Sequence, residues 1–505
     1  MEKLKGLKPE KVFEFFEYIS SVPRGSGNTS QVSELCMKFA KERGLTAFKD
    51  KVNNVVIYKA ATPGYENAPT VVLQGHLDMV ANKTTDCTKD MATEPIDLMH
   101  DEKYVYADKT TLGGDDGIAV AYALAILDSN DIEHPAIEAV FTIDEETGME
   151  GAKEINPSLI SGRLLLNIDS EEEGVFTCGC AGGCRVNGII PVTHAVLGKD
   201  DPEKTALVEI GLKGLKGGHS GADIDKQPAS ANYLLGRVLR ELYTKNEFSM
   251  VNIAGGEFDN VICQHAKAVI AVEKDLLGDV SKFISDYDNT LRAEYSCVNP
   301  DMVLSSTMID VKDIDHKKLT GWNKHSTEGN LVFLDKASTL KVLNAITLPS
   351  QGVLEMNMEL AGMVQTSQNL GIVALKDDAF HFDFLVRSSI ESQKESAVAR
   401  IRALVELLGG KISTFGNYPG FKFEADSKVR DICVEAYREC YGSEPVVNTI
   451  HAGIECGIFC DKIPGMDAVS FGPNILSIHT PDEKLDIASV ERVWNMILLI
   501  LKKIK

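Results

Sequence analysis

The side chains of this 505-residue chain that could do chemistry gather where short apolar segments end. They are histidines and carboxylates that follow four such segments: His76 and Asp78, Asp144 to Glu146, Asp169 to Glu171, and His479 to Glu483. A glycine-rich turn adds an acidic pair, Asp115-Asp116, at the expected start of a helix. One such carboxylate alone is typical of a solvated loop or a helix cap. Five features of this kind, all expected at one sheet edge, indicate a shared site.

Imidazole nitrogens together with several carboxylate oxygens suit zinc, manganese or cobalt. Two histidines and three or more acids exceed what one tetrahedral ion needs. The set therefore predicts two divalent ions, roughly 3.5–4 Å apart, that share a bridging carboxylate. A water between two cations loses its proton near neutral pH. One carboxylate of the pair Glu145-Glu146 can bind metal while its neighbour transfers protons, so we expect metal-assisted amide hydrolysis.

These side chains must be positioned by alternating strands and helices. Continuous apolar segments such as 70–73, 137–143 and 164–168 are separated by helical patterns, which predicts a parallel sheet buried on both faces. Ligands bind outside the carboxyl ends of such strands. From about residue 185 a two-residue alternation predicts an inserted α+β domain. We expect an α/β fold whose discontinuous catalytic domain, with a mostly parallel sheet flanked by helices, spans 1–185 and 386–505. A lid domain spans 186–385.

The composition excludes several classes of protein. Lysine plus arginine total 52 and aspartate plus glutamate total 74, so the formal charge is 52 − 74 = −22, which disfavours nucleic-acid and anionic-membrane partners. No segment approaches the roughly 20 apolar residues of a membrane span, and the first residues lack a secretory pattern. Eleven dispersed cysteines suit a reducing cytoplasm. The cluster Cys178, Cys180 and Cys184 lacks the paired second set of a zinc knuckle.

Other catalytic classes lack their motifs. The segment Gly218-His-Ser-Gly221 is not the G-x-S-x-G turn of serine hydrolases. The segment Gly25-Ser-Gly-Asn-Thr-Ser30 lacks the third glycine of a dinucleotide-binding turn, and no HExxH helix is present.

Over nearly its whole length the chain resembles the dinuclear-metal peptidases of clan MH, family M20, and most closely their aminoacyl-histidine dipeptidase branch. The resemblance is carried, in this order, by the motifs Ile19-Ser-Ser-Val-Pro-Arg-Gly-Ser-Gly-Asn28, Leu73-Gln-Gly-His-Leu-Asp-Met-Val80, Thr111-Leu-Gly-Gly-Asp-Asp-Gly117, Asp144-Glu-Glu-Thr-Gly148, Gly217-Gly-His-Ser-Gly221, Ile450-His-Ala-Gly-Ile-Glu-Cys-Gly457 and His479-Thr-Pro-Asp-Glu483. Many relatives carry lysine where this chain has Gly117, a departure that bears on substrate preference.

The resemblance implies a role for each position. The metal ligands would be His76, Asp115, Glu146, Asp169 and His479. Asp115 would bridge both metals, and Asp169 would share one metal with His76. Glu145 would be the general base and later the acid, and Asp78 would orient the His76 imidazole. The substrate-binding residues would be His219, Asn260 and Arg387, and His451 and Glu455 would lie near the cleft.

The resemblance also implies an activity. It is the zinc-dependent cleavage of unblocked dipeptides, including Xaa-His substrates of the carnosine type, by a cytoplasmic homodimer. Manganese and cobalt remain alternatives to zinc. N-acyl amino acids and tripeptides remain alternative substrates, and His219 could act within its own subunit or across the dimer. An inactive binding homologue would have lost Glu145 or a metal ligand, and the sequence has kept all of them.

Overall fold

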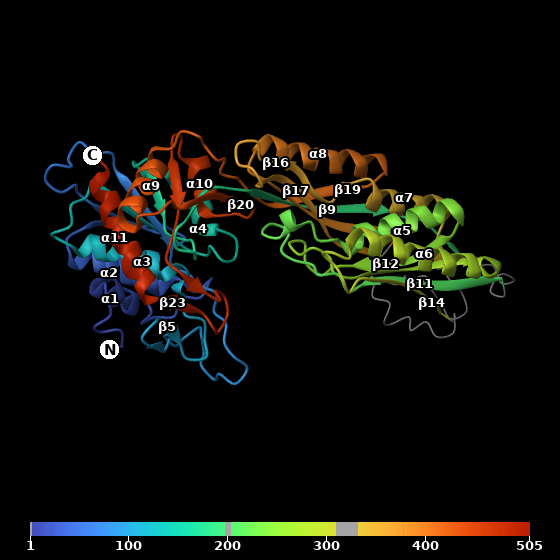
Figure 1. Ribbon diagram of the computed structural model, residues 1–505, viewed down its shortest axis with the longest axis horizontal. Coiled ribbons are helices and arrows are strands. Elements are labelled where there is room, and N and C mark those ends of the chain that lie inside the picture. Colours follow the sequence, from blue (N-terminus) through green and yellow to red (C-terminus); the bar gives the residue numbers. More distant parts are fainter. Residues whose placement is uncertain (1–2, 197–203, 310–331, 377) are drawn as a thin grey trace. The chain divides into compact units, whose positions relative to one another are not determined.

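Figure 1 shows the computed structural model, which describes residues 3–196, 204–309, 332–376 and 378–505. The chain forms two compact units. The first contains Met1–Cys180, Gly420–Thr449 and Gly453–Lys505, and the second contains Ala181–Pro419 and Ile450–Ala452. Each unit is built around a hydrophobic core of its own. No helix in the described part of the chain is long and apolar enough to cross a membrane.

The first unit is organised around a sheet whose central strands run parallel. In spatial order these are β6 (Ile137–Thr142), β3 (Val71–His76), β7 (Leu164–Asn167) and β21 (Asp467–Ser470). Every residue of β3, β6 and β7 is buried, as expected for strands covered on both faces. The parallel sheet predicted from the continuous apolar segments is thus confirmed.

The edges of this sheet differ from that pattern. The outer strands are β1 (Thr46–Lys49) and β2 (Val55–Lys59) on one side, and β8 (Val175–Cys180) and β20 (Val446–Ile450) on the other. β1 and β2 form an antiparallel hairpin that joins β6, and β8 runs antiparallel to β21. Periodicity alone could not show this, because it reports burial and not strand direction.

Helices cover the sheet of the first unit (Figure 1). They are α1 (Glu10–Ile19), α2 (Ser30–Glu42), α3 (Gly114–Asp128), α4 (Glu150–Glu154), α9 (Lys428–Tyr441), α10 (Glu455–Lys462) and α11 (Ile487–Lys503). Helix α3 is buried on all sides, so it has no polar stripe. It packs against β3 and α1, and its Tyr122 ring stacks on Trp494 of α11.

A small antiparallel sheet, which the sequence did not predict, holds the turn that carries His479. Its order is β22 (Ile475–Leu476), β23 (Lys484–Asp486), β5 (Tyr104–Ala107) and β4 (Leu98–His100). β22 pairs with β23 across the turn 477–483, and β23 pairs with β5. The turn is therefore anchored at both ends.

The second unit is an antiparallel sheet covered by helices. Its strand order is β14 (Val303–Ile309), β11 (Thr205–Lys213), β13 (Ala266–Glu273), β12 (Ser249–Gly255), β17 (Val364–Lys376), β18 (Ala379–Ser388), β9 (Gly182–Pro191) and β19 (Lys411–Tyr418), and β16 (Gly352–Met356) pairs with β17. The helices are α5 (Ala231–Lys245), α6 (Leu277–Tyr295), α7 (Lys336–Thr347) and α8 (Glu391–Leu407). Residues 386–419 belong to this unit, because α8 and β19 pack against β9.

Candidate active site

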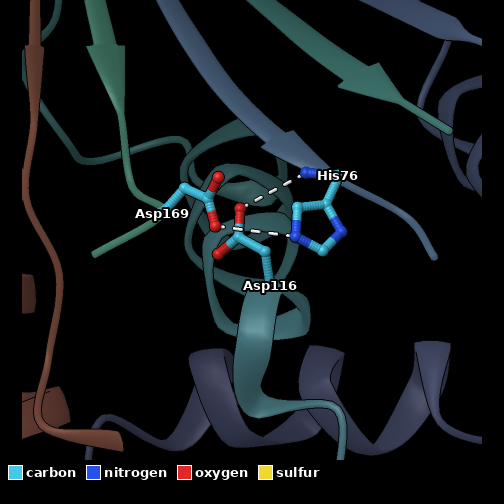
Figure 2. A group of neighbouring side chains, drawn as sticks. All are labelled: His76, Asp116 and Asp169. Carbon is cyan, nitrogen blue, oxygen red and sulfur yellow. Dashed lines mark hydrogen bonds and ion pairs between the residues drawn. The ribbon is translucent and has the colours of Figure 1, made fainter. Parts of the chain in front are cut away.

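His76 is the last residue of β3, and three acids surround its imidazole ring. Its Nδ1 lies 3.0 Å from the backbone carbonyl oxygen of Asp78 and 3.4 Å from that residue's Oδ1. Its Nε2 lies 3.2 Å from Asp115 Oδ1 and 3.5 Å from Asp169 Oδ1. Figure 2 shows the ring at the end of its strand facing Asp169, which follows β7. The carboxyl ends of neighbouring parallel strands thus bring these groups together.

Asp115 lies between the two predicted histidine ligands. It sits in the first turn of α3, where its backbone angles are not helical. Its Oδ1 faces His76 Nε2, and its Oδ2 lies 3.0 Å from His479 Nε2. Each oxygen of one carboxylate therefore meets a different imidazole, which is the arrangement that a bridging ligand needs.

Asp78 holds the turn that carries the two adjacent glutamates. Its carboxylate accepts hydrogen bonds from the backbone N–H of Glu145 at 3.1 Å and of Glu146 at 3.4 Å, and from Ser26 Oγ at 2.8 Å. The preceding residue, Asp144, has a positive φ of 53°, which turns the chain sharply after β6. The Asp78 carboxylate thus fixes the glutamate turn, while its backbone carbonyl orients His76.

His479 reaches the same place from the turn between β22 and β23. Its Nε2 lies 2.9 Å from Glu146 Oε1 in addition to its contact with Asp115. The Glu146 oxygen is buried and has no aligned hydrogen-bond donor, so the two atoms are close without forming a hydrogen bond. The backbone of His479 adopts a positive φ of 64°, a conformation that clusters at functional sites when a non-glycine residue holds it.

Asp116 is a member of the site that the sequence reasoning missed. It forms one group with His76 and Asp169, and Asp115 and Glu146 form a second group with the same histidine; in each group the potential ligand atoms lie within 4.8 Å of one another. Asp116 Oδ2 accepts a hydrogen bond from the backbone N–H of His76 at 3.3 Å (Figure 2). Its adjacency to Asp115 was the available signal. Neither group contains a cysteine, within the part of the chain that the structure describes.

Burial and mutual repulsion shift the protonation of these acids. Burial raises the pKa of Asp169 to about 7 and raises the pKa values of Glu145 and Asp116 well above the usual range. Burial also acts to raise the pKa of Asp115, but hydrogen bonds with His479 and His76 outweigh it and lower that pKa. The nearby carboxylates of Asp115 and Glu146 favour the charged imidazole and raise the pKa of His479 to about 10.

These residues fit divalent cations. The buried His76 and its neighbouring carboxylates offer ligand atoms that lie close together, and the more exposed His479 adds a second imidazole beside Asp115 and Glu146. This is the mixed nitrogen and oxygen ligand set of zinc, manganese and cobalt. The unpartnered Glu146 Oε1 is a buried acceptor without a donor, and buried acceptors are ordinarily satisfied. A cation would satisfy this oxygen and relieve the repulsion among the acids.

Glu455 supports the strand ends beneath the site. It is fully buried, and its Oε2 accepts hydrogen bonds from Gln74 Nε2 at 2.5 Å and Thr142 Oγ1 at 2.7 Å. Burial raises the pKa of Glu455 to about 7. Asn167 Nδ2 donates to Gln74 Oε1, so one polar network joins β3, β6, β7 and α10.

The predicted substrate-binding residues come together within the second unit. His219 forms an isolated bridge with Val261, and the N–H of Ser220 donates to the carbonyl oxygen of Asn260 at 2.9 Å. Arg387, on β18, has its Nη2 3.4 Å from His219 Nε2. The N–H groups of residues 221 and 222 donate to His219 Nδ1, so the proton of the neutral ring is on Nε2.

Arg387 is a buried cation without an anionic partner. It is 5% exposed and donates to the hydroxyl of Tyr418 at 2.9 Å, and its Nε has no acceptor. Among the described residues no carboxylate forms an ion pair with it. Burial and the Arg387 charge lower the pKa of His451 to about 3, and that ring lies 2.7 Å from Ser367 Oγ. The environment of Arg387 suits an incoming carboxylate.

Comparisons with known proteins identify the family of the chain. Residues 72–503 match the family "Peptidase family M20/M25/M40". The chain is 34% identical over 504 residues to the cytosol non-specific dipeptidase of Escherichia coli (strain K12), covering 100% of this chain and 99% of that protein.

Solved structures also resemble this chain. The aminoacylhistidine dipeptidase of Vibrio alginolyticus matches with a TM-score of 0.90 at 34% identity, covering 100% of this chain and 99% of that one. A tripeptidase of Staphylococcus aureus matches in fold, with a TM-score of 0.54 at 16% identity and 99% of each chain covered. The family model spans most of the chain and the full-length relative exceeds 30% identity, so the chain belongs to the M20 peptidase family.

Proposed function

We propose that this protein is a metal-dependent dipeptidase that hydrolyses the peptide bond of unblocked dipeptides, including Xaa-His substrates. The observation that carries the proposal is the convergence of His76, Asp115, Glu146, Asp169 and His479 in one place. The full-length relatives named above as a non-specific dipeptidase and an aminoacylhistidine dipeptidase support the substrate class.

The proposed site holds two divalent ions. His76 and Asp169 would hold one, and Glu146 and His479 would hold the other. Asp115, with an oxygen toward each histidine, would hold both. Zinc is the expected ion, and manganese and cobalt suit the same ligands. Two such ions supply Lewis acidity and a water of lowered pKa when bound.

Glu145 is the proposed general base. Its burial raises its pKa well above the usual range, which suits a carboxyl group that must both accept and return a proton. It takes a proton from the attacking water and gives one to the departing amine. Asp78 supports this role because its carboxylate accepts hydrogen bonds from the backbone N–H groups of Glu145 and Glu146.

The second unit supplies the proposed substrate contacts. Arg387 would bind the substrate carboxylate with its planar fork, and His219 and Asn260 would contact the scissile amide and its surroundings. We propose that this unit, predicted over 186–385, is a lid and a dimerisation domain of a cytoplasmic homodimer. The buried cation without an anionic partner supports the first of these roles.

A substrate panel tests the activity. The metal-loaded protein is incubated with carnosine, Gly-Gly, a tripeptide and an N-acetyl amino acid, and the released amino acids are quantified. We expect the two dipeptides to be cleaved and the other two compounds to react at least ten-fold more slowly. Inertness toward both dipeptides would overturn the proposal, and preference for the tripeptide or the acylated compound would move the same chemistry to that substrate class.

A further inference from the structure

A buried glutamate clamps the loop that carries Asp115. Glu483 is 2% exposed, and its carboxylate accepts four consecutive backbone N–H groups. Oε2 accepts from Leu112 at 2.8 Å and Gly113 at 3.0 Å, and Oε1 accepts from Gly114 at 2.7 Å and Asp115 at 3.4 Å. These N–H groups precede or begin α3 and lack partners within the helix. A carboxylate at this end also complements the helix dipole.

The glutamate belongs to the same turn as His479. Both lie between β22 and β23, and the N–H of Glu483 donates to the carbonyl oxygen of Thr480 at 3.1 Å. One short segment therefore supplies the predicted ligand His479 and also Glu483, which holds the loop of the predicted ligand Asp115. The 3.0 Å approach of His479 Nε2 to Asp115 Oδ2 depends on this connection.

A buried arginine holds the opposite side of the same loop. Arg24 is 1% exposed, and its Nη1 donates to the carbonyl oxygens of Leu77 at 3.0 Å and Asp78 at 3.1 Å. Its Nη2 donates to the carbonyl oxygen of Gly113. Arg24 thus ties the residues after His76 to the loop before α3.

Two glycines make room for that guanidinium. A Cβ added at Gly113 or at Gly117 would lie 2.5 Å from Arg24 Nη2. Gly113 also has a positive φ of 68°, which a side chain rarely adopts. Arg24, the two glycines and Glu483 therefore pack together around the loop.

We propose that Glu483 and Arg24 are positioning residues that fix Asp115 between His76 and His479 and thereby set the metal affinity of the site. The inference rests on the proposed two-metal function. It assigns to Glu483 and Arg24, which are not ligands, the task of positioning a ligand. The acids of the site repel one another when no cation separates them, so the loop needs an external restraint to hold Asp115 in place. Groups that orient metal ligands typically contribute 10–100-fold to metal affinity.

The test substitutes Glu483→Gln, because glutamine keeps the shape but turns one acceptor oxygen into an N–H donor that faces backbone N–H groups. Glu138→Gln is the matched control. Glu138 is also a buried carboxylate that accepts backbone N–H groups, from Ser161 and Gly162, but it lies four residues before Thr142, the partner of His76 in β6. That separation is roughly 13 Å along the strand.

Zinc affinity is measured by competition with a chromophoric chelator, and the cobalt-loaded proteins are compared by visible absorption. We expect at least a ten-fold weaker affinity for one zinc ion and a changed cobalt spectrum in Glu483→Gln. We expect wild-type affinity and spectrum in Glu138→Gln, although both variants should lose thermal stability. Wild-type zinc affinity and cobalt spectrum in folded Glu483→Gln would overturn the inference and leave the proposed function intact.

Arg24→Lys provides an independent variant, because lysine keeps the charge and loses the fork that reaches three carbonyl oxygens. It should also weaken zinc binding at least ten-fold, and unchanged binding would remove Arg24 from the proposal. If the wild-type protein itself bound fewer than two zinc ions, the proposed function and this inference would both be wrong.

Discussion

Glu145 and Glu146, which follow β6, have different surroundings, and we propose a different role for each. Glu146 Oε1 lies 2.9 Å from His479 Nε2, in the group of potential ligands. Glu145 is buried, and its pKa is raised by that burial. The backbone N–H groups of both residues are held by one carboxylate, that of Asp78. These surroundings support the proposal that one of two identical side chains binds metal and the other carries protons.

Replacing the proton carrier should separate catalysis from metal binding. In Glu145→Gln we expect turnover of a dipeptide to fall by about 10²–10⁴-fold, the usual contribution of general acid–base catalysis, while two metal ions per chain remain. Turnover is measured by amino-acid release and metal content by elemental analysis. Glu150→Gln is the control, because Glu150 is exposed and pairs with Lys153. Undiminished turnover in Glu145→Gln would remove this residue from the base role.

His451 should make the folded protein sensitive to acid. Burial and then the Arg387 charge lower its folded pKa to about 3, whereas an unfolded histidine titrates near 6.5. Protons therefore bind the unfolded chain preferentially, so this group's contribution to stability is present above pH 6.5 and is lost as the pH falls toward 3.

The variant His451→Gln should lose less stability than the wild type between pH 6.5 and pH 4, as measured by denaturant unfolding at each pH. The carboxylates titrate in both proteins, so the difference between the two curves isolates the histidine. Parallel curves would show that His451 is not held neutral by its surroundings.

At the level of elements, the site is built where strands and helices end. The strand segments were predictable, because β3, β6 and β7 are continuous apolar runs. Such runs are typical of strands that are buried on both faces of a sheet. The start of α3 was less predictable. Gly114 begins the helix, but Asp115 and Asp116 have non-helical angles, and Glu483, distant in sequence, accepts the N–H groups of Gly114 and Asp115.

Two glycine substitutions in helices should have opposite effects. In Gly117→Ala the new Cβ would lie 2.5 Å from Arg24 Nη2 and 3.1 Å from Phe16 Cε2, so we expect a loss of about 1–3 kcal/mol of unfolding free energy. In Gly278→Ala, on α6, the Cβ meets nothing within 4 Å, and we expect a gain of about 0.4–1 kcal/mol. Denaturant unfolding measures both, and a gain in Gly117→Ala would show that Arg24 can move aside.

On the scale of the whole molecule, the chain is strongly acidic, and part of that charge lies in the site. The formal charge is −22, and six of the acids, Asp78, Asp115, Asp116, Glu145, Glu146 and Asp169, lie in the site in the first unit. Two divalent ions would bring about +4 to those carboxylates and offset most of their charge. The second unit contains instead the buried Arg387, which forms no ion pair with any residue that the structure describes.

Metal removal should therefore loosen one unit and leave the other unchanged. After treatment with a chelator we expect faster hydrogen exchange in residues 72–78, 112–117, 144–146 and 477–483, because the acids repel one another without the ions. Exchange in the paired strands β11 and β13 should not change. Mass spectrometry of peptides before and after chelation, and after zinc is restored, measures both. Equal exchange with and without metal in the four segments would contradict the two-metal proposal.

The sequence by itself determined the chemistry of this protein and its main sheet. Histidines and acids after apolar runs must meet when those runs form neighbouring parallel strands, because all carboxyl ends of such strands lie at one edge. Only the tertiary structure decided what holds these residues in place. Arg24 and Glu483 entered the site through contacts between segments far apart in the chain, and local patterns of polarity carry no information about such partners.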